Sequence, residues 1–264
     1  CNFDHYYAPS ELIEKLIKNS AYVISRDRDF WRPKELLSDL PKEKFFDAVN
    51  DNWYSYVTEN NDRVISLPHF ITPDEVKLDN RERDIDVSVL GVKYYYRLEA
   101  IEALESAGIN CVTGELNRKI ISKLMQWFPA KFQISYNSSF LKILERSKTS
   151  FTCGSALGYP IRKYFEIPAA GSILLCKPFL NFENLGFKSG VNCFTVNKND
   201  LVEMVQEINR DYSSFSKIKA SASELLLSSH SYEARTTQLK SSLQAIIKNE
   251  FNGSYWSSGV FCLS

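Results

Sequence analysis

The stretch that decides the fold runs from residue 159 to residue 171 and reads Tyr-Pro-Ile-Arg-Lys-Tyr-Phe-Glu-Ile-Pro-Ala-Ala-Gly. Pro160 suits the first turn of a helix, and the small residues of 154–158 can bring the backbone close to a ligand. The N–H groups at such a helix start attract anions, and Arg162 and Lys163 add positive charge at the same end. The stretch therefore predicts a helix whose start holds phosphate groups.

Glu166 follows one turn further along this helix, on the same face as Arg162. The order Arg-then-Glu is the weaker orientation for stabilising a helix, and even good pairs contribute only about 0.2–0.5 kcal/mol. Helix stability is therefore a poor reason for the pair. A carboxylate here can accept both hydroxyls of a ribose while the cations hold its diphosphate. The alternative is a surface ion pair on an amphipathic helix.

Short apolar strands alternate with helical segments on both sides of this stretch. The predicted strands are residues 84–91, 110–114, 149–153, 172–176 and 192–196, and the other predicted helices are residues 98–105, 140–146 and 201–208, the last capped by Asn199 and Asp200. This alternation predicts an α/β protein with a doubly wound, Rossmann-like parallel sheet. Ligands bind at the carboxyl ends of the strands in such sheets, where Gly91 and Gly154 are expected.

From about Asp84 to Ile247 the sequence resembles the C-terminal half of a GT-B glycosyltransferase, most nearly the CgeB-like spore-maturation proteins and the family 1/4-type transferases. The resemblance rests on Gly91 with Arg97, the block Arg162–Phe165–Glu166–Ala170–Gly171, Asp200-Leu201, and His230-Ser231-Tyr232 followed by Arg235. In that family the carboxylate at the position of Glu166 binds the donor ribose, and nearby basic residues hold the diphosphate of a nucleotide sugar. The resemblance implies a GT-B-like hexosyl- or pentosyltransferase that needs neither metal nor cofactor.

Two groups of site residues follow. The expected donor-binding residues are Gly91, Tyr95, Arg97, Gly154, Tyr159, Arg162, Lys163, Glu166 and Gly171. The run Tyr94–Tyr96 is expected to line the cleft because it follows Gly91. The resemblance places any base that deprotonates the acceptor in the first domain, where Asp4, His5 and His69 are candidates from location alone. His230 is expected to be structural, and no histidine pair has the spacing of metal ligands.

The chain length of 264 residues allows one large domain or two small ones. We expect a partial, acceptor-side α/β domain over 1–75, a linker over 76–83, a nucleotide-sugar-binding domain over 84–235, and C-terminal helices over 236–264 that cross back to the first domain. Within the first domain, residues 11–17 and 42–59 are predicted to be helical and residues 21–25 and 63–67 to be strands. The resemblance suggests that an upstream portion is absent or that the fold is reduced.

Composition limits the partners. Thirty-two basic and thirty-two acidic residues cancel, which argues against a nucleic-acid-binding protein that relies on a large basic surface. No apolar run approaches the roughly 20 residues that span a bilayer, so we expect at most peripheral membrane contact. The six cysteines lack CxxC spacing, and four lie in predicted strands. A reducing cytoplasm is the expected location.

Three functions remain open. The first is transfer of a sugar from a nucleotide diphosphate sugar to a glycan or lipid-linked acceptor. The second is a nucleotide-sugar epimerase of the same fold, which needs no acceptor. The third is a non-catalytic module that assembles with other domains of a larger polysaccharide-synthesis chain, which would bind no nucleotide.

Overall fold

The computed structural model describes residues 15, 18–26, 43–49, 61–77, 82–91, 95–114, 139–154 and 160–264. These residues form two compact units. Unit 1 holds the described residues up to His69 together with Glu183–Gly186 and Glu233–Ser264, and unit 2 holds those within Phe70–Phe182 and Phe187–Tyr232. The division expected from the sequence, into an acceptor-side domain, a linker, a nucleotide-sugar-binding domain and C-terminal helices, stays a prediction.

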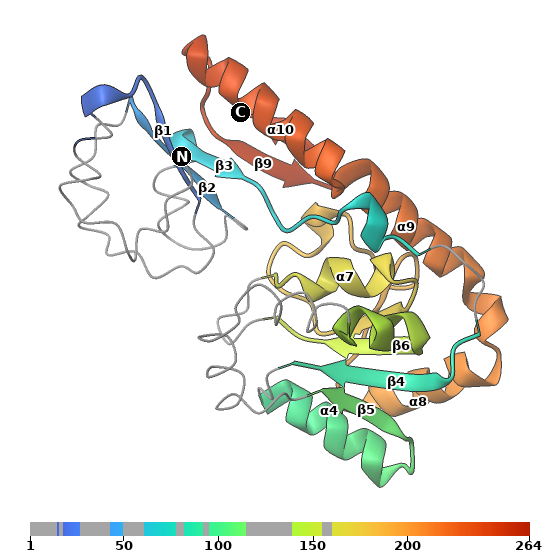
Figure 1. Cartoon of the computed structure of the whole chain (residues 1–264). Helices are drawn as coiled ribbons and strands as arrows, with labels where there is room; N and C mark the ends of the chain where they lie inside the picture. Colours follow the sequence, from blue (N-terminus) through green and yellow to red (C-terminus); the bar gives the residue numbers. More distant parts are fainter. Residues whose placement is uncertain are drawn as a thin grey trace. The chain divides into compact units, whose positions relative to one another are not determined.

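Unit 2 is built on a five-stranded parallel sheet with the order β5-β4-β6-β7-β8. Figure 1 labels three of these strands, β6, β4 and β5. Its strands are β4 (Ile85–Leu90), β5 (Cys111–Gly114), β6 (Ser147–Thr152), β7 (Ile173–Cys176) and β8 (Phe194–Thr195). In register, Val87 lies opposite Cys111 on one side and Thr149 on the other. If the five strands are numbered 1 to 5 along the chain, their order across the sheet is 2-1-3-4-5. The direction in which successive strands are added therefore reverses between β4 and β6. Ligand sites form at such a switch point.

Helices cover both faces of this sheet. They are α4 (Tyr95–Ser106), a helix over 139–146, α7 (Lys163–Ala169), α8 (Lys198–Arg210) and α9 (Ser216–Ser229), with short 3-10 turns η2 (Pro73–Glu75) and η4 (Tyr212–Phe215). The crossovers from β4 to β5 and from β6 to β7 run in opposite directions, so right-handed connections put α4 and α7 on opposite faces. The apolar residues Val87, Val89, Phe151 and Leu175 pack with α4 and α8.

Buried serines line the sheet between these apolar positions. The Ser88 hydroxyl lies 2.8 Å from that of Ser150 and 3.0 Å from that of Ser147, and Ser150 lies 2.9 Å from Ser172. Each hydroxyl therefore has a partner, which offsets the cost of burying it. Because serine is small, this face leaves room for α7, which packs on β6, β7 and α9.

Unit 1 contains a three-stranded parallel sheet with the order β1-β2-β3. Its elements are β1 (Val23–Arg26), β2 (Phe45–Val49), η1 (Asn61–Arg63), β3 (Val64–Ser66), η3 (Glu183–Leu185), α10 (Tyr232–Ile247, from Glu233 onward), and the antiparallel hairpin of β9 (Ser254–Ser257) and β10 (Val260–Leu263). Phe46 and Ile65 share a core with Ile246 and Phe251. Trp256 Nε1 donates to the Ser66 carbonyl at 3.1 Å.

The parallel α/β architecture is confirmed, and so are the strands predicted near 84–91, 110–114, 149–153 and 172–176. The strand predicted over 192–196 is reduced to β8. The helix predicted over 42–59 is wrong where the structure describes it, because Phe45–Val49 forms β2 with every residue buried. A short run that is apolar except for Asp47 fits a buried strand as well as a helix, so its periodicity could not decide.

Two boundaries also differ, and one element was not predicted. The motif helix begins at Lys163 instead of Pro160, and the helix near 200 is capped by Asn197, whose side chain accepts from the main-chain N–H groups of Asn199 and Asp200. The hairpin that follows α10 was missed. Its turn, Ser258-Gly259, has positive φ at both residues, which is the signature of a two-residue hairpin turn.

Candidate functional site

The switch point of the unit 2 sheet brings Gly91, at the end of β4, close to Lys163, at the start of α7. Gly91 has a φ of +104°, and a side-chain carbon placed on it would lie 2.7 Å from Lys163 Nζ and 3.6 Å from Arg97 Nη1. Only glycine adopts this conformation without strain and leaves that space open. Gly91 therefore lets two cations approach the carboxyl end of β4.

Arg97 reaches this place from the first turn of α4. Arg97 is 1% exposed, and its Nη2 lies 3.4 Å from both Thr152 Oγ1 and the Cys153 carbonyl at the end of β6. Burial, and next the charge of Arg97, lowers the pKa of Lys163 to about 8. Two cations are thus held together at a cost that a bound anion would relieve.

Glu166 follows Lys163 by one turn of α7, and its side chain is 16% exposed. Burial raises the pKa of this carboxyl, while the charges of Arg162 and Lys163 oppose the rise. Arg162 Nε lies 2.8 Å from Glu166 Oε1. Within the part of the chain that the structure describes, no other side chain hydrogen-bonds this carboxylate, so Oε2 can accept from a ligand.

Arg162 has a second acidic partner. Its Nη2 donates to Oε1 of Glu75 in η2, while Oε2 of Glu75 accepts from the main-chain N–H of Thr72 at 2.7 Å and from its hydroxyl at 2.9 Å. The Arg162 guanidinium therefore bridges two carboxylates, one on η2 and one on α7.

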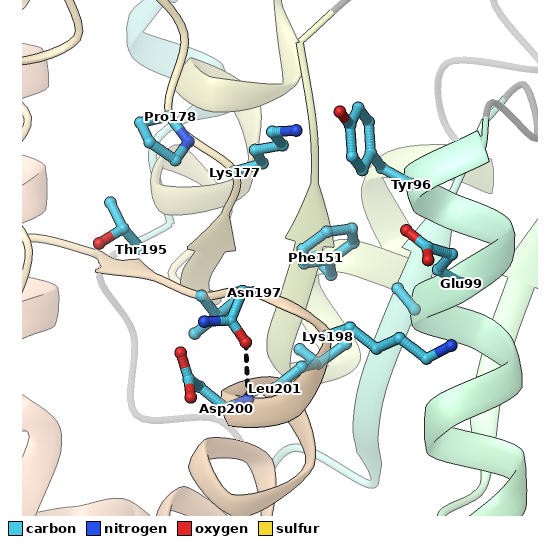
Figure 2. Close-up of a pocket in the computed structure, with 12 residues that line it drawn as sticks. Tyr96, Glu99, Phe151, Lys177, Pro178, Thr195, Asn197, Lys198, Asp200 and Leu201 are labelled. Carbon is cyan, nitrogen blue, oxygen red and sulfur yellow. Dashed lines mark hydrogen bonds between the residues drawn. The ribbon is translucent and has the colours of Figure 1, made fainter.

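A cavity of about 570 Å³ lies at the same carboxyl edge, between the starts of α4 and α8 (Figure 2). Tyr96 and Lys177 point toward each other across it, with Lys177 Nζ 3.1 Å from the centre of the Tyr96 ring. Phe151 lies on the cavity wall below them, and Glu99 and Asn197 contribute polar groups. The volume falls in the range of small-molecule sites.

Sequence comparison identifies the family to which these residues belong. The model of the family described as "Glycosyl transferase-like" matches residues 97–241, which is more than half of the chain. The chain belongs to the glycosyl transferase-like family. The match begins at Arg97 and includes Arg162, Lys163 and Glu166. No curated protein matches the chain, and the narrower CgeB-like assignment stays a prediction.

Solved structures of GT-B glycosyltransferases share the fold. A glycosyltransferase from Rickettsia africae has 15% identity and a TM-score of 0.60, over 90% of this chain and 80% of that one. Anabaena HepE, solved with UDP and glucose, has 11% identity and a TM-score of 0.58, over 85% and 72% of the two chains. Sucrose-phosphate synthase from Thermosynechococcus elongatus has 11% identity and a TM-score of 0.59, over 90% and 71%. At these identities the likeness establishes the fold alone.

The glycosyl transferase-like unit gathers most of the predicted donor-binding residues at one edge of its sheet. Those brought together are Gly91, Arg97, Gly154, Arg162, Lys163 and Glu166. Tyr159, Asp4 and His5 lie outside the described residues, so their roles stay predictions. His69 belongs to unit 1, where its carbonyl accepts from Arg235 Nη2 at 3.0 Å, and its role as a base is likewise untested.

Two predicted residues lie elsewhere. Tyr95 is 69% exposed and does not line the cavity that its neighbour Tyr96 helps to form. Gly171 precedes β7, at the amino edge of the sheet, whereas the cluster lies at the carboxyl edge. A side-chain carbon there would lie 2.5 Å from Arg83 Nη2, and its φ is +74°. Packing at the base of the sheet therefore explains Gly171 without a ligand.

His230 is fully buried, as a structural role requires. Its ring stacks on Phe187 at 6.2 Å and meets the edge of Phe165 at 5.1 Å between centroids. These contacts support the interpretation of His230 as part of an aromatic core behind α7.

Three residues of this region were not predicted from the sequence: Glu75, which accepts from Arg162, Thr72, which holds Glu75, and Lys177, which lines the cavity. The first two carry a readable signal, because Thr72-Pro73-Asp74-Glu75 has the Thr-x-x-Glu spacing of a capping box. No local sequence pattern marks Lys177, because its position at the cavity depends on where β7 ends.

Among the described residues, no three His, Cys, Asp or Glu side chains gather as a metal site requires. None of their helices is long and apolar enough to cross a membrane. Metal independence and location stay predictions.

Proposed function

We propose that this chain transfers a sugar from a nucleoside diphosphate sugar to a hydroxyl of a glycan or lipid-linked acceptor, without a metal ion. The observation that carries the proposal is a pair of cations, the buried Arg97 and the partly buried Lys163, beside the carboxylate of Glu166 at the switch point of the sheet. Cations and a carboxylate side by side match the two ends of a ribose diphosphate.

Arg97 and Lys163 bind the diphosphate. Both lie within 4 Å of one point next to Gly91, at 3.6 and 2.7 Å, so a single phosphate group can reach both. Arg162, predicted from the sequence to share this role, is instead engaged by Glu75 and Glu166. We therefore assign the phosphate role to Lys163 and Arg97.

Glu166 binds the ribose. One of its carboxylate oxygens faces Arg162 at 2.8 Å, which leaves the other to accept from the ribose hydroxyls. A carboxylate whose pKa burial has raised gains from these hydrogen bonds, because they favour its charged form.

In the reaction, the bond between the anomeric carbon of the sugar and the diphosphate oxygen breaks, and the bonding electrons stay on the diphosphate. Lys163 and Arg97 are already in place to stabilise that charge, which is where preorganised electrostatics act most strongly. A base takes the proton of the acceptor hydroxyl as it attacks the anomeric carbon. Asp4, His5 and His69 remain the proposed candidates for that base.

The cavity beside Tyr96 takes the part of the substrates beyond the diphosphate. Its lining mixes apolar side chains such as Phe151 and Leu201 with the polar groups of Glu99 and Asn197. This mixture suits a sugar ring, which has both apolar C–H faces and hydroxyls. Cys153 is close enough to Arg97, Lys163 and the cavity residue Lys177 for all three charges to act on its thiol, so the cavity adjoins the proposed phosphate site.

The donor is proposed to be a UDP-sugar, because Anabaena HepE was solved with UDP-glucose. The epimerase and the non-catalytic module remain alternatives, and a cytoplasmic location is part of the proposal. An epimerase would convert the donor without an acceptor, and the module would bind no nucleotide.

The test is a thermal-shift screen with UDP, ADP and GDP, followed by calorimetric titration of the best ligand. A nucleotide at 100 times its dissociation constant should stabilise the protein by about 2.7 kcal/mol. Release of UDP from UDP-sugars is then measured with and without acceptors, in EDTA. Binding with acceptor-dependent release supports the proposal, and absence of any nucleotide binding refutes it.

A further inference from the structure

We propose that Glu75 is a positioning residue for the nucleotide site: through Arg162 it holds the Glu166 carboxylate in the orientation that accepts the ribose hydroxyls. The inference rests on the proposed nucleotide site. It extends that site to η2, a turn 87 residues before Arg162 in the chain.

Glu75 is itself held firmly. Its side chain is 11% exposed, and Thr72 donates both its main-chain N–H and its hydroxyl to Glu75 Oε2. The main-chain N–H of Glu75 donates in return to the Thr72 carbonyl at 3.0 Å. With Oε2 occupied in this way, Oε1 is left in a fixed position toward Arg162.

The segment that carries Glu75 is anchored to the rest of unit 2 at both ends. The Lys77 N–H donates to the carbonyl of Ala169, the last residue of α7, at 2.8 Å. At the other end, the Ile71 N–H donates to the His230 main-chain carbonyl at 2.9 Å, and the Tyr232 N–H donates to the Ile71 carbonyl at 2.8 Å. The distance between η2 and α7 is therefore set by main-chain hydrogen bonds.

Arg162 needs such an external support. It precedes α7, and its side chain is 49% exposed, so the helix alone leaves its long side chain free to take many rotamers. Two carboxylates on either side restrict the guanidinium, whose planar set of donors suits this bridging role. The guanidinium in turn restricts Glu166 through the 2.8 Å contact with Oε1.

Charge and position predict opposite effects for Glu75→Gln, which makes the test decisive. The charged groups that act on Glu166 are Arg162, Lys163 and Glu75, and Glu75 raises its pKa. Removing that negative charge would favour ionised Glu166 and, by electrostatics alone, would strengthen binding of a diphosphate. Loss of the support for Arg162 would weaken it.

The experiment is calorimetric titration of UDP into wild type and Glu75→Gln, with Asp84→Asn as the matched control. Asp84 pairs with Arg146 in the same unit, at the amino end of β4, and both partners are more than half exposed, at 56% and 57%. We expect Glu75→Gln to weaken UDP binding by about tenfold and Asp84→Asn to leave it unchanged.

A double variant separates a positioning role of Glu75 from a general structural role. In Glu166→Gln, whose own UDP affinity is lower, adding Glu75→Gln should cause no further loss, because Glu75 acts through Glu166. If Glu75→Gln fails to fold, Arg162→Lys, which keeps the charge and loses the bridging fork, should give the same pattern.

The inference is overturned if Glu75→Gln binds UDP as tightly as wild type or more tightly, or if it causes the same loss in the Glu166→Gln background. These outcomes leave the proposed function intact, because wild type still binds UDP. If wild type binds no nucleoside diphosphate, the proposed function fails first and the inference fails with it.

Discussion

The ammonium group of Lys163 lies 2.7 Å from the point where a side-chain carbon on Gly91 would be. The two residues are far apart in sequence, and the strand order brings them together, because β4 and β6 are neighbours at the switch point. Gly91 thus has two reasons to be glycine, its φ of +104° and the cation next to it. This arrangement fixes where the proposed diphosphate binds and leads to the first prediction.

Gly91→Ala should weaken UDP binding by about tenfold or more, because the new methyl group displaces Lys163. The strained φ should also cost about 1 kcal/mol of folding stability. Gly108→Ala is the matched control, since Gly108 also has a positive φ, of +70°, but nothing lies within 4 Å of its added carbon. Calorimetric titration and melting curves check both variants. Equal UDP affinity in the two variants would remove Lys163 from the vicinity of the ligand.

UDP affinity should fall as the pH rises through about 8, the pKa of Lys163 in the ligand-free protein. Below this value the ammonium form is present. Above it the diphosphate must first restore the proton, so binding weakens and is accompanied by proton uptake. Titrations between about pH 7 and pH 9.5, in buffers of different ionisation enthalpy, measure both effects. Lys163→Arg, which stays charged, should lose this pH dependence, and its persistence in that variant would assign it to another group.

Glu166→Ala should weaken UDP binding by roughly 10- to 100-fold, because the hydrogen bonds to the ribose hydroxyls are lost. Folding stability should change by less than about 1 kcal/mol, because Arg162 keeps Glu75 as a partner and is half exposed. Titration and thermal unfolding of wild type and variant are the measurements. A large loss of stability with unchanged affinity would mean that the carboxylate serves the fold alone.

Tyr96→Ala should raise the KM for the sugar donor or the acceptor severalfold, because it removes one wall of the cavity shown in Figure 2. Tyr95→Ala is the control. Tyr95 has the same side chain at the adjacent position but is 69% exposed and outside the cavity. Steady-state kinetics with UDP-sugar and acceptor distinguish the two. Equal effects of both substitutions would exclude the cavity from substrate binding.

Local pattern and short-range chemistry made the parallel sheet predictable, and they also indicated the candidate site on α7. A strand, a glycine-containing loop, a helix and charged residues follow each other closely around Glu166. Their order alone was enough to predict that the start of this helix lies at the carboxyl edge of the sheet. The role of Arg162 was not predictable in this way. Its partner Glu75 lies 87 residues earlier, in a segment that the sequence presents only as a polar capping motif.

The misassigned elements have the same kind of cause. Phe45–Val49 is the central strand of its sheet, paired with β1 on one edge and β3 on the other, and all five of its residues are buried. A strand that is buried on both faces shows no alternation of apolar and polar residues, so periodicity cannot reveal it. The sequence places Gly171 with the donor site because it closes the motif, yet in the structure it precedes β7, at the opposite edge of the sheet from the start of α7. The hairpin of β9 and β10 was not predicted, although the Ser258-Gly259 pair at its turn is a sequence signal for such a turn.

The most direct test of the central claim, that Lys163 on α7 binds a diphosphate beside the ribose site of Glu166, is calorimetric comparison of UDP with uridine on wild type and Lys163→Gln. Wild type should bind UDP at least about tenfold more tightly than uridine, and Lys163→Gln should lose most of that difference while uridine binding stays the same. Wild type that binds UDP no better than uridine, or Lys163→Gln that keeps the full difference, would contradict the account.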